Sequence, residues 1–467
     1  MAGSGNWGCF SPVDVRYYEK GLAPYLSEDG FTQHKLKVEV ALVRALQRRG
    51  ICDTGAVVEI EDACSQVTTA EVYAEEGRIK HDIRALVNCI QRRVSDGAKP
   101  FVHMTATSFD IVDTANALRF KMATQEVVVP ALIVLERTLI GIALRDAELI
   151  QVGRTHGQHA VPITFGFAIA QFVDRLGSCI DRINGLADNL TGKFSGAVGA
   201  YNASSLFFED AEAFEAEVLA ELGLKPARIS TQIAPPEPLI RLIDELGIAG
   251  GIIANLARDM RNLQRSEIGE VGEAFEVAQV GSSTMPQKRN PINFENSESL
   301  WKVLQGRLVT VHLDQISDHQ RDLTNSASGR TYGEIFCYLL SMATRMNSTM
   351  KKLTVDKSNL ERNLALTKGM IIAEPLYIIL ASLGHPDAHE AVRALTLHAQ
   401  TCDKPLEEVV VADDAMQPYL VRMTDYQRQL LNDPTSYTGI AAAKARSVAN
   451  YWNTILSLKE INDGSST

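Results

Sequence analysis

The sequence predicts an all-α protein built from long helices. Over the middle of the chain, apolar residues recur at steps of three and four, which is the pattern of helices that bury one face. Strand-like alternation is scarce, and the short run at residues 409–411 (Val-Val-Val) is the candidate for a strand. A chain of 467 residues is long enough for several domains or for fewer long ones.

Three central helices follow from this pattern. Their apolar stripes, in chain order, are Leu132, Leu135, Leu139 and Ile142; Ile169, Val173, Leu176, Ile180 and Ile183; and Ile252, Leu256, Met260 and Leu263. The second stripe has charged residues on its opposite face, among them Asp174, Arg175, Asp181 and Arg182. Stripes this apolar must face other helices, either within a monomeric helical protein or between subunits.

Two breaks divide the chain. One is the turn-forming run Asp-Gly-Ala-Lys-Pro at residues 96–100, and the other lies near residues 354–357. They predict an N-terminal helical domain at 1–98, a central long-helix domain at 99–353, and a C-terminal helical domain at 354–467.

The composition is that of a soluble globular protein, with 45% hydrophobic and 22% charged residues. A net charge of −11 argues against a general nucleic-acid binder but permits a local basic pocket. Seven scattered cysteines without a CxxC pair indicate free thiols in a reducing compartment.

The N-terminal residues lack the pattern of a secretory signal. The longest apolar runs, such as residues 127–135 around Pro130, are too short to span a bilayer. We therefore expect a cytoplasmic protein that does not associate with membranes.

Residues 281–291 (GSSTMPQKRNP) form the most informative segment. Pro286 and Pro291 fix the backbone and indicate a shaped loop. Between them and Gly281 lie donors suited to an anion, or to a carbanion whose charge spreads into a carboxylate. A solvated surface loop is the simpler alternative.

Residues 154–159 (RTHGQH) contain two histidines that could share one helical face. His156 and His159 could then bind a metal, but no cysteine and no HExxH glutamate accompanies them. A structural histidine that caps or bridges helices is another alternative. Histidine is also the usual acid near neutral pH.

Shorter polar motifs accompany these two segments. His81 and Asp82 are an adjacent acid and base, which alone would be a solvated helix turn. Thr107 and Ser108 precede a long helix, where a residue of this type caps the helix and free N–H groups attract anions.

Residues 321–330 (RDLTNSASGR) place two arginines and several hydroxyls within ten residues. An arginine fork matches phosphate or carboxylate, although a salt-bridged surface turn has the same composition.

These segments resemble one known superfamily. The loop at 281–291 resembles the fumarase/aspartase signature GSSxMPxKxNP at every fixed position, and RTHG resembles that superfamily's second conserved region. Arg16-Tyr17, His81-Asp82, the TQI around Gln232, and RDLT-S-x3-R at 321–330 are similar to the adenylosuccinate lyase branch. The segment GKFSGAVGAY, which ends at Tyr201, also fits. The resemblance runs from about Arg16 to residues 437–441.

The resemblance implies a three-domain fold with a long central bundle, which forms a twenty-helix core in a homotetramer. It makes Ser283 the base and His156 the acid. His159 is the alternative acid, because it is so close in sequence that the motif alone does not distinguish the two histidines. The substrate-binding residues that it implies are Arg16, Tyr17, Lys80, His81, Asp82, Thr107, Ser108, Gln232, Lys288, Asn290, Arg321, Ser326 and Arg330. Each site would combine three subunits.

The implied activity is elimination of fumarate through a carbanion. The substrates would be adenylosuccinate, which gives AMP, and the succinylated imidazole-carboxamide ribotide SAICAR, which gives AICAR. No metal or organic cofactor is expected, and the partner is a succinylated nucleotide rather than nucleic acid or membrane.

Two departures from the branch bear on the substrate. The segment after His156 reads GQHAVPITFG instead of the enterobacterial GQPATPSTIG, and Phe109 follows the Thr-Ser pair. The alternatives are another superfamily lyase (argininosuccinate lyase, aspartase, fumarase or a carboxymuconate cycloisomerase) and a non-catalytic structural protein on the same fold. The arginines that would face a phosphate favour the nucleotide substrate.

Overall fold

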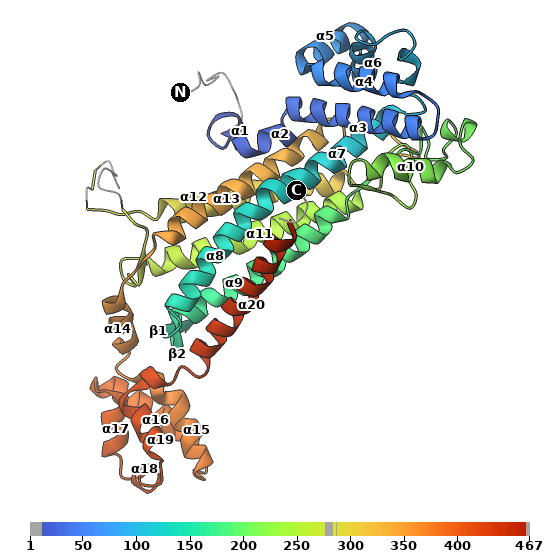
Figure 1. Ribbon diagram of the computed structural model, residues 1–467. Helices are drawn as coiled ribbons and strands as arrows, with labels where there is room; N and C mark the ends of the chain where they lie inside the picture. Colours follow the sequence, from blue (N-terminus) through green and yellow to red (C-terminus); the bar gives the residue numbers. More distant parts are fainter. Residues whose placement is uncertain (1–11, 276–283, 286, 464–467) are drawn as a thin grey trace. The chain divides into compact units, whose positions relative to one another are not determined.

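The computed structural model describes residues 12–275, 284–285 and 287–463, without the side chains of 12, 14 and 457–463. The described chain is mainly helical, as predicted (Figure 1). It forms two compact units. Unit 1 takes its described residues from Met1–Leu132, Ser178–Ile253 and Glu298–Thr344; unit 2 takes its own from Ile133–Gly177, Ala254–Ser297 and Arg345–Thr467. This division does not test the three consecutive domains expected from the sequence, which remain a prediction.

The helices that lie wholly in unit 1 are mostly short. They are α1 (Pro12–Val15), α2 (Ala23–Leu26), α3 (Glu28–Arg48), α4 (Thr54–Gln66), α5 (Thr69–Ile79), α6 (Asp82–Gln91), α7 (Ser108–Ala123) and α10 (Ala211–Ala220). Side-chain caps start several of them: Ser27 accepts from the N–H of Gly30 at α3, and Thr68 and Glu71 form a capping box at α5. Helix α4 packs on α3 and α5 packs on α6, as Figure 1 shows.

Five long helices lie in the middle of the chain, and three of them carry the predicted apolar stripes. The five are α8 (Val129–Arg145), α9 (Phe165–Asp188), α11 (Glu237–Leu263), α12 (Ile292–Leu313) and α13 (Tyr332–Lys351), and the stripes lie on α8, α9 and α11. The stripes on α8 and α9 are buried throughout, and Asp174 and Arg175 are exposed, as predicted. The boundaries between the units fall inside these five helices.

Glycines allow close helix packing within each unit. In unit 1, a Cβ at Gly247 of α11 would lie 2.5 Å from Leu308 of α12. In unit 2, a Cβ at Gly177 of α9 would lie 2.4 Å from the ring of Trp452 on α20. Both positions therefore require glycine.

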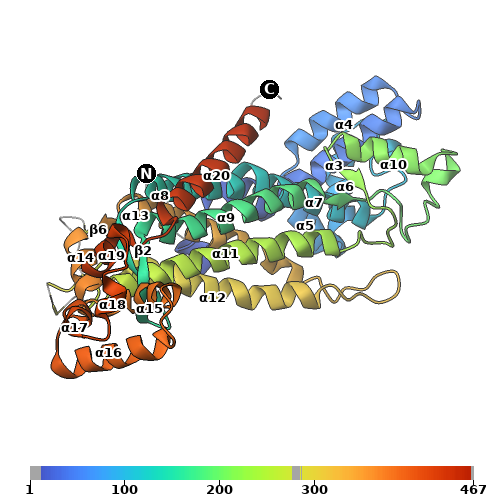
Figure 2. The ribbon, with the colours of Figure 1, turned by 90° about the horizontal axis from the view of Figure 1, so that it is seen from below.

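The remaining helices belong to the C-terminal part of unit 2. They are α14 (Lys357–Ala365), α15 (Ala373–Ser382), α16 (Ala388–Cys402), α17 (Leu406–Ala412), α18 (Gln417–Leu420), α19 (Asp425–Asn432) and α20 (Ala441–Asp463). Figure 2 shows α15–α19 as one group, and they share a core that includes Leu376, Leu380, Leu406 and Val410. The predicted strand at 409–411 is wrong, because Leu406, Val409 and Val410 form the buried face of α17. A short apolar run does not distinguish a strand from a buried helix.

Short 3-10 segments and three small sheets complete the fold. The 3-10 segments are η1 (Lys20–Leu22), η2 (Lys99–Phe101), η4 (Ser204–Leu206), η5 (Ser328–Thr331), η6 (Met370–Ile372) and η7 (Pro434–Ser436). The antiparallel pairs are β1 (Ile150–Thr155) with β2 (Gln158–Thr164), and β5 (Val271–Gly272) with β6 (Thr354–Val355); β3 (Thr191–Gly192) and β4 (Lys225–Pro226) are parallel. The hairpin β1–β2 was not predicted.

A π-helical turn, η3 (Thr124–Val128), joins α7 to α8 ahead of Pro130. Proline has no N–H and collides with the carbonyl four residues earlier, and a wider turn relieves both problems. The continuous helix Ser108–Arg145 has 38 residues and contains a stretch apolar enough to cross a bilayer. The prediction that no stretch is long enough to cross a bilayer is therefore wrong by length and composition. Half of that stretch is buried, and core helices of soluble proteins can be equally long and apolar.

Candidate active site

Unit 1 contains a cavity of about 490 Å³ that gathers several predicted residues. One face of α7, the start of α3, the segment before α11 and the connection from α12 to α13 line it. Asp82, Arg321, Ser326 and Arg330 all line this cavity, although Asp82 is distant in sequence from the segment 321–330 that contains the other three. The structure therefore brings together four of the residues chosen from motifs; below, this space is called the arginine cavity.

Arg321 lies flat against an aromatic ring. Its guanidinium carbon is 3.3 Å from the ring centre of Phe109. Burial lowers the pKa of Arg321, while the nearby carboxylates of Asp113, Asp322 and Asp82 act in the opposite sense. Phe109, a departure from the branch's usual sequence, thus supports the arginine by a cation–π contact.

The connection that carries Arg321 is held by two aspartates. Asp314 accepts hydrogen bonds from the hydroxyls of Ser328 (2.6 Å) and Tyr332 (2.8 Å). Asp322 accepts from the backbone N–H of Asp318 and Thr324, at 2.7 and 2.8 Å. These bonds give the connection a fixed shape, because short polar side chains that bond to nearby backbone stabilise turns.

Arg330 has a partner inside the protein. Its Nη1 lies 2.5 Å from Oε1 of Glu28, and the hydroxyl of Tyr73 donates to the other oxygen of Glu28 at 2.6 Å. Both members of the ion pair are about half exposed. Both residues line the arginine cavity.

Asp113 was not found by the sequence motifs. One of its oxygens accepts from the N–H of Ala234 at 2.8 Å, and the side chain lines the arginine cavity. Burial raises the pKa of Asp113 to about 6, against the opposing effects of the Ala234 hydrogen bond, Lys193 and Arg321. The sequence contains one signal for Asp113: it follows Phe109 by four residues, which places both on the same face of a helix.

Thr107 is the N-cap residue of α7, as expected, but neither it nor Ser108 lines the arginine cavity. The carboxylate of Asp110 accepts from the backbone N–H of Thr107 at 2.7 Å. Asp110 also forms a fully buried ion pair with Lys193. The segment that contains Lys193 therefore supports the start of α7 through this ion pair.

A strained segment precedes this cap. His103 and Thr105 have φ angles of 62° and 67°, which residues other than glycine rarely adopt. Nδ1 of His103 lies 2.7 Å from Oε1 of Glu39, a residue that is only 2% exposed. Burial alone would lower the pKa of His103, but Glu39 outweighs burial and raises it. The motifs did not identify this histidine.

The other predicted residues of unit 1 lie outside the arginine cavity. Lys80, with φ of 60°, ends α5, and His81 caps α6 by accepting from the N–H of Arg84 at 3.2 Å. Arg16 is exposed, and Tyr17 and Gln232 are partly buried. Ile233, next to Gln232, does line the cavity.

In unit 2 the RTHG motif forms the tip of the β1–β2 hairpin, so the shared helical face expected for His156 and His159 is wrong. Thr155 pairs with Gln158 across a two-residue turn of His156 and Gly157. Their φ angles are 54° and 75°, as a type I′ turn requires. The turn exposes the His156 side chain.

A buried carboxylate anchors this hairpin. Glu270 is fully buried and accepts from Arg154 (2.5 Å), Gln151 (2.7 Å) and Asn363 (2.8 Å). Several donors on one carboxylate make the interaction specific in geometry. Arg154 thus holds the base of the turn, two residues before His156.

His159 differs from His156 in its surroundings. It lies on β2 opposite Arg154, and its Nδ1 is buried without a hydrogen-bond partner among the described residues. Burial, together with the Arg154 cation, lowers the pKa of His159. Of the two histidines, His156 is the exposed one and His159 the partly buried one.

Ser283 lies outside the described residues. On the described side of the loop, Lys288 is exposed and Asn290 is partly buried. Glu273 accepts from the backbone N–H of both Asn293 and Phe294 at 2.9 Å. It thereby joins the residues that precede the loop to the first turn of α12 that follows it.

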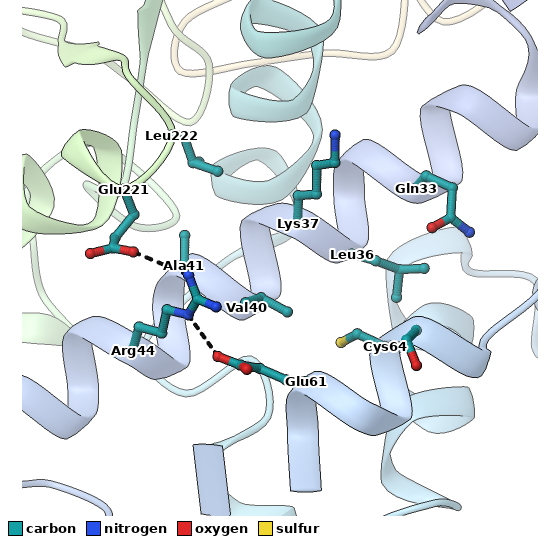
Figure 3. Close-up of a pocket in the computed structure, with 11 residues that line it drawn as sticks. Gln33, Leu36, Lys37, Val40, Ala41, Arg44, Glu61, Cys64, Glu221 and Leu222 are labelled. Atoms are coloured by element: carbon teal, nitrogen blue, oxygen red, sulfur yellow. Dashed lines mark hydrogen bonds and ion pairs between the residues drawn. The ribbon is translucent and has the colours of Figure 1, made fainter. Parts of the chain in front are cut away.

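A second cavity of unit 1, about 410 Å³, lies among α3, α4 and the end of α10 (Figure 3). Arg44 forms ion pairs there with Glu61 (2.6 Å) and Glu221 (3.5 Å). None of the predicted site residues lines this cavity. Over residues 12–275, 284–285 and 287–463, no group of three or more His, Cys, Asp and Glu side chains is arranged to hold a metal ion.

Comparisons with known proteins agree with the fold and the motifs. The family model described as "Lyase" matches residues 22–306, and the model described as "Adenylosuccinate lyase C-terminal" matches residues 317–438. An adenylosuccinate lyase of Pyrococcus abyssi is 38% identical over 94% of this chain and 97% of its own. The corresponding protein of Archaeoglobus fulgidus is 34% identical over 95% of this chain and 99% of its own.

Among solved structures, 3-carboxy-cis,cis-muconate lactonizing enzyme from Pseudomonas putida has a TM-score of 0.82 at 27% identity, and the match covers 95% of this chain and 99% of that one. The fold and these matches define a lyase of the fumarase/aspartase superfamily. Within that superfamily, the chain belongs to the adenylosuccinate lyase family.

Proposed function

We propose that this enzyme releases fumarate from adenylosuccinate to give AMP, and from SAICAR to give AICAR. The observation that carries the proposal is the arginine cavity, where Arg321, Ser326 and Arg330 of one segment meet Asp82, which is distant in sequence. A lyase that acts on aspartate, malate or argininosuccinate has no phosphate to bind. A phosphorylated substrate therefore accounts for these arginines better than the alternatives do.

The chemistry follows from the roles implied by the motifs. Ser283 removes a proton from the carbon next to a carboxylate, and Lys288 and Asn290 stabilise the charge that spreads into that carboxylate. His156 protonates the leaving nitrogen, and fumarate departs. Arg16, Tyr17, Lys80, His81, Asp82, Thr107, Ser108 and Gln232 complete the substrate contacts. Binding energy from the remote phosphate aligns the succinyl group.

The direct test is fumarate release from adenylosuccinate by the wild type and by Ser283→Ala. Loss of the base should lower kcat by at least about 10³-fold while KM changes little. Ser282→Ala is the matched control in the same loop. A wild type that folds but releases no fumarate would refute the substrate, and an active Ser283→Ala would refute the base.

The active enzyme is further proposed to be a homotetramer in which three subunits supply each site. Exposed apolar residues at the end of α12 support this, because Val309 (61% exposed) and Leu313 (67%) are four residues apart on the helix, and Ile316 (74%) follows shortly after it. The cytoplasmic location rests on the six described cysteines, all of which are free.

Mixing two inactive variants tests the shared site. If Ser283 and His156 of one site come from different subunits, unfolding and refolding Ser283→Ala together with His156→Gln should restore about a quarter of wild-type activity, since each residue is intact in half of the subunits. Light scattering should give the mass of four chains. No recovered activity in mixed tetramers would contradict the shared site.

A further inference from the structure

One cation in the arginine cavity belongs to none of the motifs. Arg119, on the cavity-facing side of α7, lies over two aromatic rings. Its guanidinium carbon is 4.0 Å from the ring centre of Phe31 and 4.8 Å from that of Phe120. Its Nε donates to Oδ1 of Asn116 at 2.9 Å. These contacts hold the planar group in one orientation and leave its terminal nitrogens for another partner.

Among the described residues, Arg119 forms no ion pair with a carboxylate. Elsewhere in unit 1, Arg49 is also stacked on a phenylalanine, Phe208, and pairs with both Glu217 and Asp210. Burial lowers the pKa of Arg119 to about 10, with a smaller opposing effect from Glu28. A desolvated cation without a counter-ion is costly, and an anionic ligand would remove that cost.

Four of the five carboxylates that line the same cavity accept hydrogen bonds from other groups, and the fifth, Asp82, lies 3.6 Å from Nδ1 of His81. Glu28 accepts from Arg330 and Tyr73, and Asp314 accepts from Ser328 and Tyr332. Asp322 accepts from Thr324 and Asp318, and Asp113 from Ala234. Among the described residues, Arg119 is therefore a cation of this cavity that no carboxylate contacts directly, and its terminal nitrogens face the cavity without a hydrogen-bond partner.

We propose that Arg119 is an additional phosphate-binding residue, which recognises the phosphate of the substrate together with Arg321 and Arg330. A phosphate oxygen pair fits the fork of terminal nitrogens that the two rings and Asn116 leave unused. Arg119 provides binding energy and distinguishes a nucleotide from its nucleoside. This assignment rests on the proposed nucleotide substrate.

The test compares two ligands that differ only in the phosphate. Arg119→Met keeps the length that packs on Phe31 and Phe120 but removes the charge. Its kcat/KM for adenylosuccinate should fall about 10- to 100-fold, the usual loss for charged hydrogen bonds, while its kcat/KM for the unphosphorylated succinyladenosine should stay within about threefold. Arg49→Met, stacked but outside the cavity, should change neither value. Equal losses on both ligands, or no loss on either, would overturn the proposal.

Calorimetry with AMP and adenosine separates this inference from the proposed reaction. The wild type should bind AMP more tightly, and Arg119→Met should lose most of that preference even if no fumarate is released. If Arg119→Met does not fold, Arg119→Lys tests the assignment instead. A lysine lacks the fork of two nitrogens, so the preference for AMP over adenosine should fall by about tenfold. An unchanged preference in a folded Arg119→Lys would contradict the assignment.

Discussion

The two units support their site residues in different ways. In unit 1, arginine and hydroxyl side chains converge on one cavity, where Phe109 stacks on Arg321 and the buried Asp314 holds the connection that carries it. The buried Asp110–Lys193 pair supports the start of α7. In unit 2, the motif residues His156 and Lys288 are exposed on a hairpin tip and a loop. There the support acts on the backbone, through Glu270 at the hairpin and Glu273 at the loop. Under the proposed function, unit 1 would bind the phosphate in a preformed cavity, and unit 2 would supply exposed reacting groups that need protection from water.

The largest expected effect separates the two histidines of unit 2. His156→Gln should lower kcat by about 10³-fold, which is the usual contribution of a positioned acid, with little change in KM. His159→Gln, at the partly buried position, should lower kcat by less than about tenfold. Steady-state fumarate release measures both. A larger loss in His159→Gln would move the acid to His159 and reverse the comparison.

The anchor of the hairpin should matter for stability as well as for rate. Glu270→Gln leaves Arg154, whose side chain is 16% exposed, without its charge partner. We expect a loss of about 3 kcal/mol, because removal of one member of a buried pair strands the other. Urea unfolding measures it. Glu148→Gln breaks the exposed pair with Arg446 in the same unit and should cost less than about 1 kcal/mol. Equal midpoints for the two variants would contradict the anchoring role.

In unit 1 the expected kinetic change has a different form. Arg321→Met should reduce kcat/KM for adenylosuccinate by about 100-fold, mainly through KM, because a phosphate contact contributes binding energy far from the broken bond. Arg48→Met, which removes a surface pair with Glu221, serves as the control. A fall in kcat alone would place Arg321 with the reacting groups and remove the distinction between the units.

The smallest effect concerns Asp113 and has a defined pH dependence. Its pKa is raised by burial to about 6 in the folded protein, so its contribution to stability is complete below pH 4 and is lost as pH rises through 6. Asp113→Asn should therefore be more stable than the wild type at pH 8 by about 2 kcal/mol, with no difference at pH 4. Thermal unfolding at the two pH values measures this. A variant that is less stable at pH 8 would refute the desolvated carboxylate.

The sequence by itself determined the helical class, the apolar stripes and the motifs that place the chain in its family. Periodic burial depends on residue spacing alone, and the stripes of α8 and α9 are buried as predicted. The motif at 321–330 was recognisable because its arginines and hydroxyls match an anion, and Asp82 because the His81-Asp82 pair is similar to one of the family.

Only the tertiary structure decided which of these residues meet. The hairpin at His156 depends on left-handed backbone at two successive residues, a conformation not apparent in RTHG. The segment 409–411 became a helix because burial of α17 overrode β propensity. Arg119, Asp113 and the His103–Glu39 pair acquire their roles from neighbours distant in sequence. Desolvation and lack of a charge partner are properties of three-dimensional surroundings, and therefore no spacing rule along the chain could identify Arg119 or the His103–Glu39 pair.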